Sequence, residues 1–355
     1  MKLRICKWLV SFAVYSCLIF FVSTVAAGKP DKPPGKPPKS GPPPNHALAV
    51  AGFKNSDIRV MDVDGGNSER IARGVSSYPS IPMVWSPDGT WIIWADGYNR
   101  DLQMVNADGS NRQEILASTG EMMPNILGMH NLASSGYDCD GNQANLLYFL
   151  GMVTDEPWNW SPEDSWEEFY VLDLNDLSTP PVRLTNNELE RHTTLAVSPY
   201  GQFIATWTYA SSESLSDGRL EIRDVCGNDL LPVISSWTAE DLGQNPGSQF
   251  YYRIDWSSKD ILAVSGRDED NDYNIYLIDL LSESITALKI TGTGTGFGAG
   301  IDNFRQSWSP DGSQLAFKSG NEVYILDIDT GAFTFVVGSR SIRGLDWRPT
   351  WVANP

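Results

Sequence analysis

The stretch Trp308-Ser309-Pro310-Asp311-Gly312 ends one predicted strand and turns the chain into a second at Gln314–Phe317, with a third at Val323–Asp327. Pro310 sets φ to about −65° at the first corner, which favours a tight reversal. Asp311 can bond its own backbone, and Gly312 can adopt the left-handed conformation that closes the turn. The stretch therefore predicts short antiparallel strands joined by tight turns.

The same turn recurs along the chain. It is complete at Trp85-Ser-Pro-Asp-Gly89 and altered at Val197, Trp256 and Trp347. A second signature, an alternating strand that ends in Asp or Asn, occurs at 58–62, 102–106, 169–173, 220–224, 275–279 and 323–327. About four short strands in each 40 to 60 residues is the pattern of a β-propeller. We therefore predict an all-β protein, a six-bladed β-propeller of four-stranded antiparallel blades.

The two ends of the repeat region complement each other. The first blade has a second strand at 46–53 and a third at Ile58, but no Trp turn comes before them. The last Trp turn, at Trp347, has no strands after it. We expect the C-terminal strand Ser341–Trp347 to pair with the N-terminal blade and close the ring, which removes free sheet edges.

The sequence divides into three segments. Residues 1–27 read as a signal peptide, with basic residues before the apolar core Trp8–Val22 and cleavage near Ala27. The alternative is a retained N-terminal anchor. Residues 28–45 form a linker rich in proline and lysine, and 46–355 form the propeller. We expect a secreted or periplasmic protein with no membrane span after cleavage.

The turn at Trp85 and Trp308, followed by a short apolar strand, resembles the propeller repeats of the TolB-like (PD40, WD40-like repeat) family. The resemblance covers roughly residues 46–350. It implies a propeller that binds a partner protein and takes part in envelope assembly or transport. TolB itself carries a separate α/β domain before its propeller, whereas this chain has a proline-rich stretch there, so a role in the Tol system does not follow from the resemblance.

The chain is strongly acidic, with a formal net charge of −18. Such a surface disfavours nucleic acid and anionic membranes as partners and favours a cationic protein or peptide. The other interpretation is an acidic surface that only serves solubility. We expect a monomer.

The third blade departs most from the repeat, because a long insertion, Gly151–Glu168, separates its second and third strands. Insertions on one loop of a repeat protein are where ligands usually bind. A glycine-rich segment, 291–301, adds a further loop. The aromatic side chains predicted on this loop face are Trp158, Trp160, Trp166, Trp237 and Phe297. Exposed rings suit peptides or sugars, although tryptophans can equally hold a long loop in place.

Two acidic runs resemble the start of a calcium loop. One contains Asp138 and Asp140, and the other contains Asp268, Asp270 and Asp272. Ca²⁺ takes six to eight oxygen ligands, which such runs begin to supply. The alternative is a polar hairpin turn, and no other cofactor is indicated.

Cys139 and Cys226 remain once the signal peptide is removed. Both lie in predicted turns of neighbouring blades, and an even number of cysteines in an oxidising compartment indicates pairing. We predict a disulfide if both turns lie at the same end of the ring.

The sequence indicates no catalytic residues. It contains no Gly-x-Ser-x-Gly elbow, and its three histidines are scattered over different blades. A binding module is therefore favoured over an enzyme. The alternatives are a carbohydrate-binding or polysaccharide-lyase-like propeller and a structural scaffold without a small ligand.

Overall fold

The repeated turns fold as the sequence predicts. In the computed structural model, Gly89 and Gly312 each have a φ of +65°. The Ser309 hydroxyl donates to the Asp311 carboxylate over 2.7 Å, and the Ser313 amide donates to it over 3.0 Å. These hydrogen bonds, that of Ser309 first, stabilise the ionised carboxylate and lower the pKa of Asp311 to about 2.

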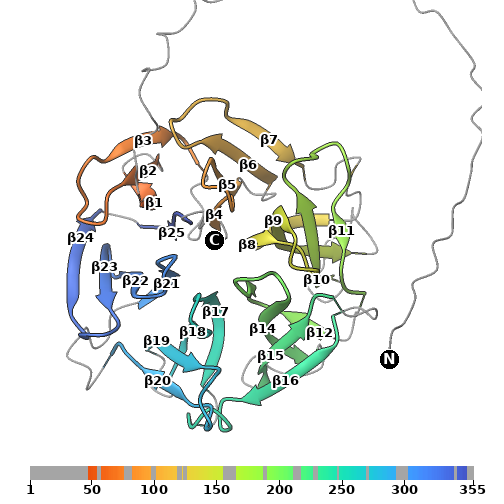
Figure 1. The fold of residues 1–355 in the computed structure, drawn as a ribbon, viewed down its shortest axis with the longest axis vertical. Helices are drawn as coiled ribbons and strands as arrows, with labels where there is room; N and C mark the ends of the chain where they lie inside the picture. Colours follow the sequence, from red (N-terminus) through yellow and green to blue (C-terminus); the bar gives the residue numbers. More distant parts are fainter. Residues whose placement is uncertain are drawn as a thin grey trace, which may run out of the picture. The chain divides into compact units, whose positions relative to one another are not determined.

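The strands form six antiparallel sheets, arranged as blades around a ring (Figure 1). The first strand of each blade lies toward the centre of the ring, and the last strand lies at the outside (Figure 1). The structure describes residues 47–53, 57–75, 82–96, 101–117, 122, 126–154, 165–186, 190–210, 217–226, 231–245, 248–268, 272–292, 303–339 and 342–349. The predicted signal peptide and linker lie outside these residues.

Blades one to three come from the first half of the chain. From the centre outward, blade one contains β25 (Gly344–Trp347), β1 (Leu48–Phe53), β2 (Asp57–Met61) and β3 (Glu69–Ala72). Blade two contains β4 (Met83–Trp85), β5 (Trp91–Asp96), β6 (Asp101–Asn106) and β7 (Gln113–Leu116). Blade three contains β8 (Ile126–Tyr137), β9 (Gln143–Thr154), β10 (Ser165–Asp173) and β11 (Val182–Arg183).

Blades four to six follow in chain order. In blade four, β12 (Glu190–His192) and β13 (Ala196–Val197) both pair with β14 (Phe203–Ala210), which is followed by β15 (Arg219–Asp224) and β16 (Val233–Thr238). Blade five contains β17 (Gln249–Trp256), β18 (Ile261–Arg267), β19 (Tyr273–Asp279) and β20 (Ala287–Lys289). Blade six contains β21 (Asn303–Trp308), β22 (Gln314–Ser319), β23 (Glu322–Asp327) and β24 (Phe333–Gly338).

The predicted closure of the ring is confirmed. β25 pairs antiparallel with β1, so that Leu48 lies opposite Trp347 and Ala51 lies opposite Gly344. Strands from the two ends of the chain thus share one blade.

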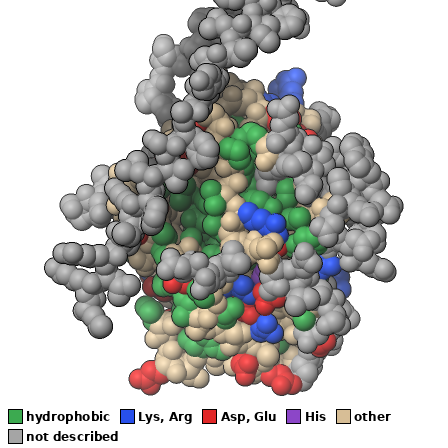
Figure 2. Space-filling view, turned by 90° about the vertical axis from the view of Figure 1, so that its right-hand side faces the viewer, with side chains coloured by type: hydrophobic (Ala, Val, Ile, Leu, Met, Phe, Trp, Pro, Cys, Tyr) green, Lys and Arg blue, Asp and Glu red, His purple; other side chains and the backbone are tan. Residues whose placement is uncertain are grey.

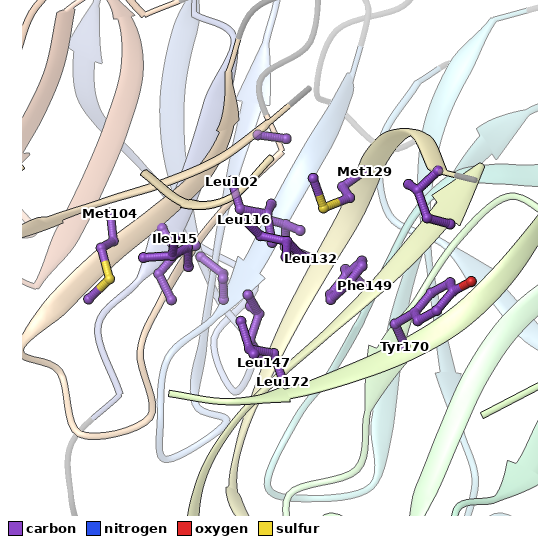
Figure 3. Close-up of a cluster of buried hydrophobic side chains, with 14 of the residues drawn as sticks. Leu102, Met104, Ile115, Leu116, Met129, Leu132, Leu147, Phe149, Tyr170 and Leu172 are labelled. Carbon is purple, nitrogen blue, oxygen red and sulfur yellow. The ribbon is translucent and has the colours of Figure 1, made fainter. Parts of the chain in front are cut away.

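Side chains that alternate between the two faces of each strand form the apolar cores between neighbouring blades. Successive side chains of a strand point to opposite faces, and in β1 Leu48 and Val50 pack toward blade six while Ala49 and Ala51 pack toward blade two. Among the described residues, each of the six blade boundaries has its own buried apolar cluster. Figure 3 shows the cluster between blades two and three, where Leu102 and Leu116 face Leu132 and Phe149.

The third blade has longer strands than the sequence suggests. The insertion was predicted as loop over 151–168, but β9 runs to Thr154 and β10 begins at Ser165. The register pairs Trp166 with Val153 and Glu168 with Gly151. Residues 166–169 read Trp-Glu-Glu-Phe, so apolar and polar side chains do not alternate and the period of a strand could not be recognised from the sequence.

Charged side chains of both signs gather on the side of the ring that faces the viewer in Figure 2. Blade four contains a network of ion pairs between its strands β12 and β15. Arg223 donates to Glu190 and to the buried Glu221, each over 2.6 Å. Arg219 also donates to Glu221 over 2.6 Å. Two arginines thus balance two glutamates, and removing one partner would leave a buried charge uncompensated. Because the positive and negative charges of the network neutralise each other, we assign it a role in stabilising the blade.

Leu345→Ala tests whether β25 closes the ring. Leu345 is fully buried at the boundary with blade six, so its truncation should lower the free energy of unfolding by about 2–5 kcal/mol in urea titrations. Leu281→Ala is the matched control, because Leu281 is 75% exposed and its loss should cost less than about 0.5 kcal/mol. Equal stabilities of the two variants would contradict the closure.

Candidate functional site

A cavity of about 630 Å³ opens at the end of the ring where the first strands turn into the second strands. Turn residues such as Pro87, Pro199 and Pro310 form part of its lining. Every blade contributes to it from its first strand: Asp346 of β25, Val84 of β4, Leu132 of β8, Val197 of β13, Asp255 of β17 and Ser307 of β21. The cavity is therefore the mouth of the central channel.

The residue before the repeat tryptophan links neighbouring blades at this mouth. Asp255 accepts a hydrogen bond from the Trp308 amide over 2.6 Å, Ser307 accepts one from the Trp347 amide over 3.0 Å, and Asp346 accepts one from the Trp85 amide over 2.8 Å. The inner edge of each first strand has amides without a ladder partner, and buried amides need acceptors. Polar side chains at one repeated position supply them from blade five around to blade two.

The two aspartates share one electrostatic environment. Asp346 is 7% exposed and also accepts from the Ser307 hydroxyl over 3.0 Å and from Arg253 over 3.3 Å. Burial raises the pKa of Asp346 to about 7, with Asp255 adding to the shift and Arg253 opposing it. Burial likewise raises the pKa of Asp255 to about 6, again against the pull of Arg253. Because the two carboxylates disfavour simultaneous ionisation, the pair gains a proton near neutral pH.

Arginine side chains lie behind these acids. Arg253 lines the cavity, and Arg305 sits three residues before the repeat tryptophan of β21, as Arg253 does in β17. Burial, together with the positive charges of Arg253 and Arg343, lowers the pKa of Arg305 to about 9. Within the cavity wall, acidic and basic side chains meet where Arg253 lies 3.3 Å from Asp346.

The opposite wall of the cavity is mostly apolar, although Ser134, Ser135 and Ser198 also line it. Blades two to four contribute Val84, Leu132, Leu195 and Val197. At the rim, the rings of Tyr137 and Tyr200 are 5.9 Å apart, and Tyr200 is 65% exposed. A concave site with one apolar wall and one charged wall can bind a segment that carries both kinds of group.

Comparisons with known proteins agree with this architecture. No protein-family model matches the sequence. Over 68 residues the chain is 40% identical to the Tol-Pal system protein TolB of Mannheimia succiniciproducens, a match that spans 19% of this chain and 15% of that protein. The crystal structure of TolB from Acinetobacter baumannii aligns with a TM-score of 0.55 at 16% identity, covering 86% of this chain and 67% of that one. The structure of putative TolB from Agrobacterium tumefaciens gives a TM-score of 0.52 at 12% identity, covering 86% and 100%.

The chain has a TolB-like six-bladed β-propeller fold. This confirms the family resemblance and the fold class predicted from the Trp-Ser-Pro-Asp-Gly turns. Within the described ranges, the TolB-like propeller has no helix long and apolar enough to cross a membrane.

Of the aromatic residues predicted as binding residues, Trp166 and Trp237 are described by the structure, and neither lines the cavity of the TolB-like propeller. Trp166 is buried, and its indole donates to the Glu168 carboxylate over 2.8 Å. Trp237, on the outer strand β16, is half-buried against the core between blades four and five. Trp158, Trp160 and Phe297 lie outside the described residues, so binding at their loop face stays a prediction.

Two of the predicted calcium residues, Asp138 and Asp268, accept hydrogen bonds from nearby groups. Asp138 accepts from the amides of Asp140 and Asn142 over 3.0 and 2.8 Å. Asp268 accepts from the Asp272 amide over 2.9 Å and from the Lys289 ammonium over 2.8 Å. Asp270 lies outside the described residues. No three His, Cys, Asp or Glu side chains in the described parts of the chain are grouped so that they could hold a metal ion, and calcium binding stays a prediction.

The structure brings Cys139 and Cys226 together. The Cys226 sulfur is 2.8 Å from the Cys139 carbonyl oxygen, and both residues carry free thiols.

Sequence reasoning missed Arg253, Asp255 and Asp346. A signal was present, since an acid directly precedes the repeat tryptophan at both Asp255-Trp256 and Asp346-Trp347. In an alternating strand that position faces away from the side on which the tryptophan packs, toward the next blade, where each acid accepts a hydrogen bond from a tryptophan amide.

Asp346→Asn tests the buried acid pair. The pKa of Asp346 is about 7 in the folded protein and about 3.9 in an unfolded chain. The folded state therefore binds more protons between these values, and the contribution of Asp346 to stability falls as pH rises from about 4 to about 7. Relative to the wild type, Asp346→Asn should gain of the order of 1–3 kcal/mol between pH 5 and pH 8 in urea titrations.

Asp241→Asn is the control for this titration. Hydrogen bonds from Thr238 lower the pKa of the exposed Asp241, so its stability difference from the wild type should stay constant between pH 5 and pH 8. A constant difference for Asp346→Asn as well would show that Asp346 is ionised throughout this range.

Proposed function

We propose that this chain is a secreted or periplasmic TolB-like propeller that binds a partner protein or peptide at its cavity and serves in envelope assembly or transport. The observation that carries the proposal is the cavity of about 630 Å³, lined from all six blades, with one apolar and one charged wall. The fold and the short stretch of 40% identity to a Tol-Pal system protein support it.

The lining suits a polypeptide. Protein interfaces concentrate binding energy in a few buried aromatic or apolar anchors surrounded by polar groups. The apolar wall offers a place for such an anchor, and the rim tyrosines Tyr137 and Tyr200 offer flat apolar rings with a polar end.

Charge selects the kind of partner. The net charge of −18 gives a field that attracts cations and speeds their association. Asp255 and Asp346 place acidic groups in the cavity wall itself. A partner with basic residues near an apolar anchor fits both features.

A photo-crosslinking amino acid, p-benzoylphenylalanine, at position 200 tests the proposal in the full-length chain within its native organism. Tyr200 is 65% exposed at the rim, and Phe335, 52% exposed on the outer strand β24, provides the control position. We expect one protein adduct from position 200 that position 335 does not give. A third position, Trp158, tests the predicted loop face.

The outcomes separate the alternatives. An adduct from position 158 alone would move the site to the loop face. If no position gives an adduct and purified glycans quench the tryptophan fluorescence, the carbohydrate-binding alternative would replace the proposal.

A further inference from the structure

We propose that Cys139 and Cys226 form a disulfide that joins blades three and four at the rim of the cavity. This modification goes beyond partner binding and holds whether or not the proposed function is correct.

The topology places both cysteines at the same end of the ring. Cys139 lies in the turn between β8 and β9, and Cys226 directly follows β15, in the connection to β16. In a blade of up-and-down strands, the first-to-second and third-to-fourth connections share one end. The cavity opens at this same end, because turns between first and second strands line it.

The distance between the two residues is short. The Cys226 sulfur is 2.8 Å from the carbonyl oxygen of Cys139. A carbonyl oxygen lies about 2.4 Å from its own Cα, so this sulfur is within about 5 Å of the Cα that carries the partner thiol. The two turns therefore touch at the cysteines, and the proposal requires rotation of the side chains to bring the two sulfurs together.

Local hydrogen bonds hold both turns in place. The Asp138 carboxylate accepts from the amides of Asp140 and Asn142 on either side of the first turn. The Asp224 carboxylate accepts from the Cys226 amide over 2.8 Å. The two thiols are therefore presented by fixed backbone, which reduces the entropy lost when they join.

An external oxidant can reach the pair, because Cys226 is exposed and Cys139 is partly exposed. A disulfide of the form R–S–S–R, small or protein-borne, supplies the oxidising equivalents. One cysteine thiolate attacks it and releases the first R–SH, and the second cysteine displaces the other R–SH from the mixed disulfide. Two protein thiols are oxidised to one disulfide, and R–S–S–R is reduced to two thiols.

The bond would fix the rim of the cavity. Cys139 is two residues from Tyr137, whose ring packs near Tyr200. The backbone is close here as well, since a Cβ on Gly201 would lie 2.3 Å from the Tyr137 carbonyl oxygen. The turn of blade three has lost the Trp-Ser-Pro-Asp-Gly sequence but keeps its local hydrogen bonds to Asp138, and the disulfide adds a covalent link to the next blade.

The full-length wild-type chain, exported and purified without reductant, provides the first test. Iodoacetamide should alkylate Cys139 and Cys226 only after dithiothreitol treatment, and peptide mapping should find the two joined. Reduction should lower Tm by roughly 5 °C, since the bond closes a loop between residues 87 positions apart. Alkylation of both thiols before reduction would overturn the proposal.

The variants Cys139→Ser and Cys226→Ser are the controls, because they show whether dithiothreitol lowers Tm by any route other than reduction of this disulfide. Each should show the Tm of the reduced wild type and no response to dithiothreitol. A separate assay oxidises the reduced wild type with oxidised glutathione. An internal disulfide is the expected product, whereas a stable glutathione adduct on each cysteine would show that the sulfurs do not meet.

Discussion

Every blade of this ring must bury both of its faces, and the rest of the structure depends on that constraint. Leu48 and Val50 on one face of β1 pack toward blade six, while Ala49 and Ala51 on the other pack toward blade two. A strand buried on both faces lacks the polar side of an ordinary half-exposed strand. Stability therefore requires a neighbour on each side of each blade, and only a closed ring provides one. The pairing of β25 with β1 meets this requirement with strands from opposite ends of the chain.

The interactions that hold the ring together also shape its cavity. Asp255, Ser307 and Asp346 satisfy the amides of the next blade, and the same three side chains line the channel mouth. Burial of two acids beside a single lining arginine raises the pKa of both. Natural proteins often keep such costly groups at functional sites. A partner that supplies positive charge there would replace the shared proton, which links binding to pH.

Much of the fold follows from local sequence, because turns and alternation depend on residues close together in the chain. Pro310 and Gly312 define a turn within five residues, and six copies of a period-two strand define six blades. The cavity depends on contacts such as that between Trp85 and Asp346, which are 261 positions apart, and no local pattern encodes them. Trp166 was placed on a loop for a related reason: its insertion has the charge of a loop, yet Trp166 lies in β10 and its side chain is buried in the core between blades two and three.

Hydrogen exchange of the full-length chain, followed by mass spectrometry on short peptides, tests the closed ring most directly. The amides of β25 are bonded to β1 only if the two ends of the chain share a blade. The account predicts that Gly344–Trp347 exchanges as slowly as the other inner strands, β17 and β21. Exchange of Gly344–Trp347 within seconds, with β17 and β21 still protected, would contradict it and leave an open ring.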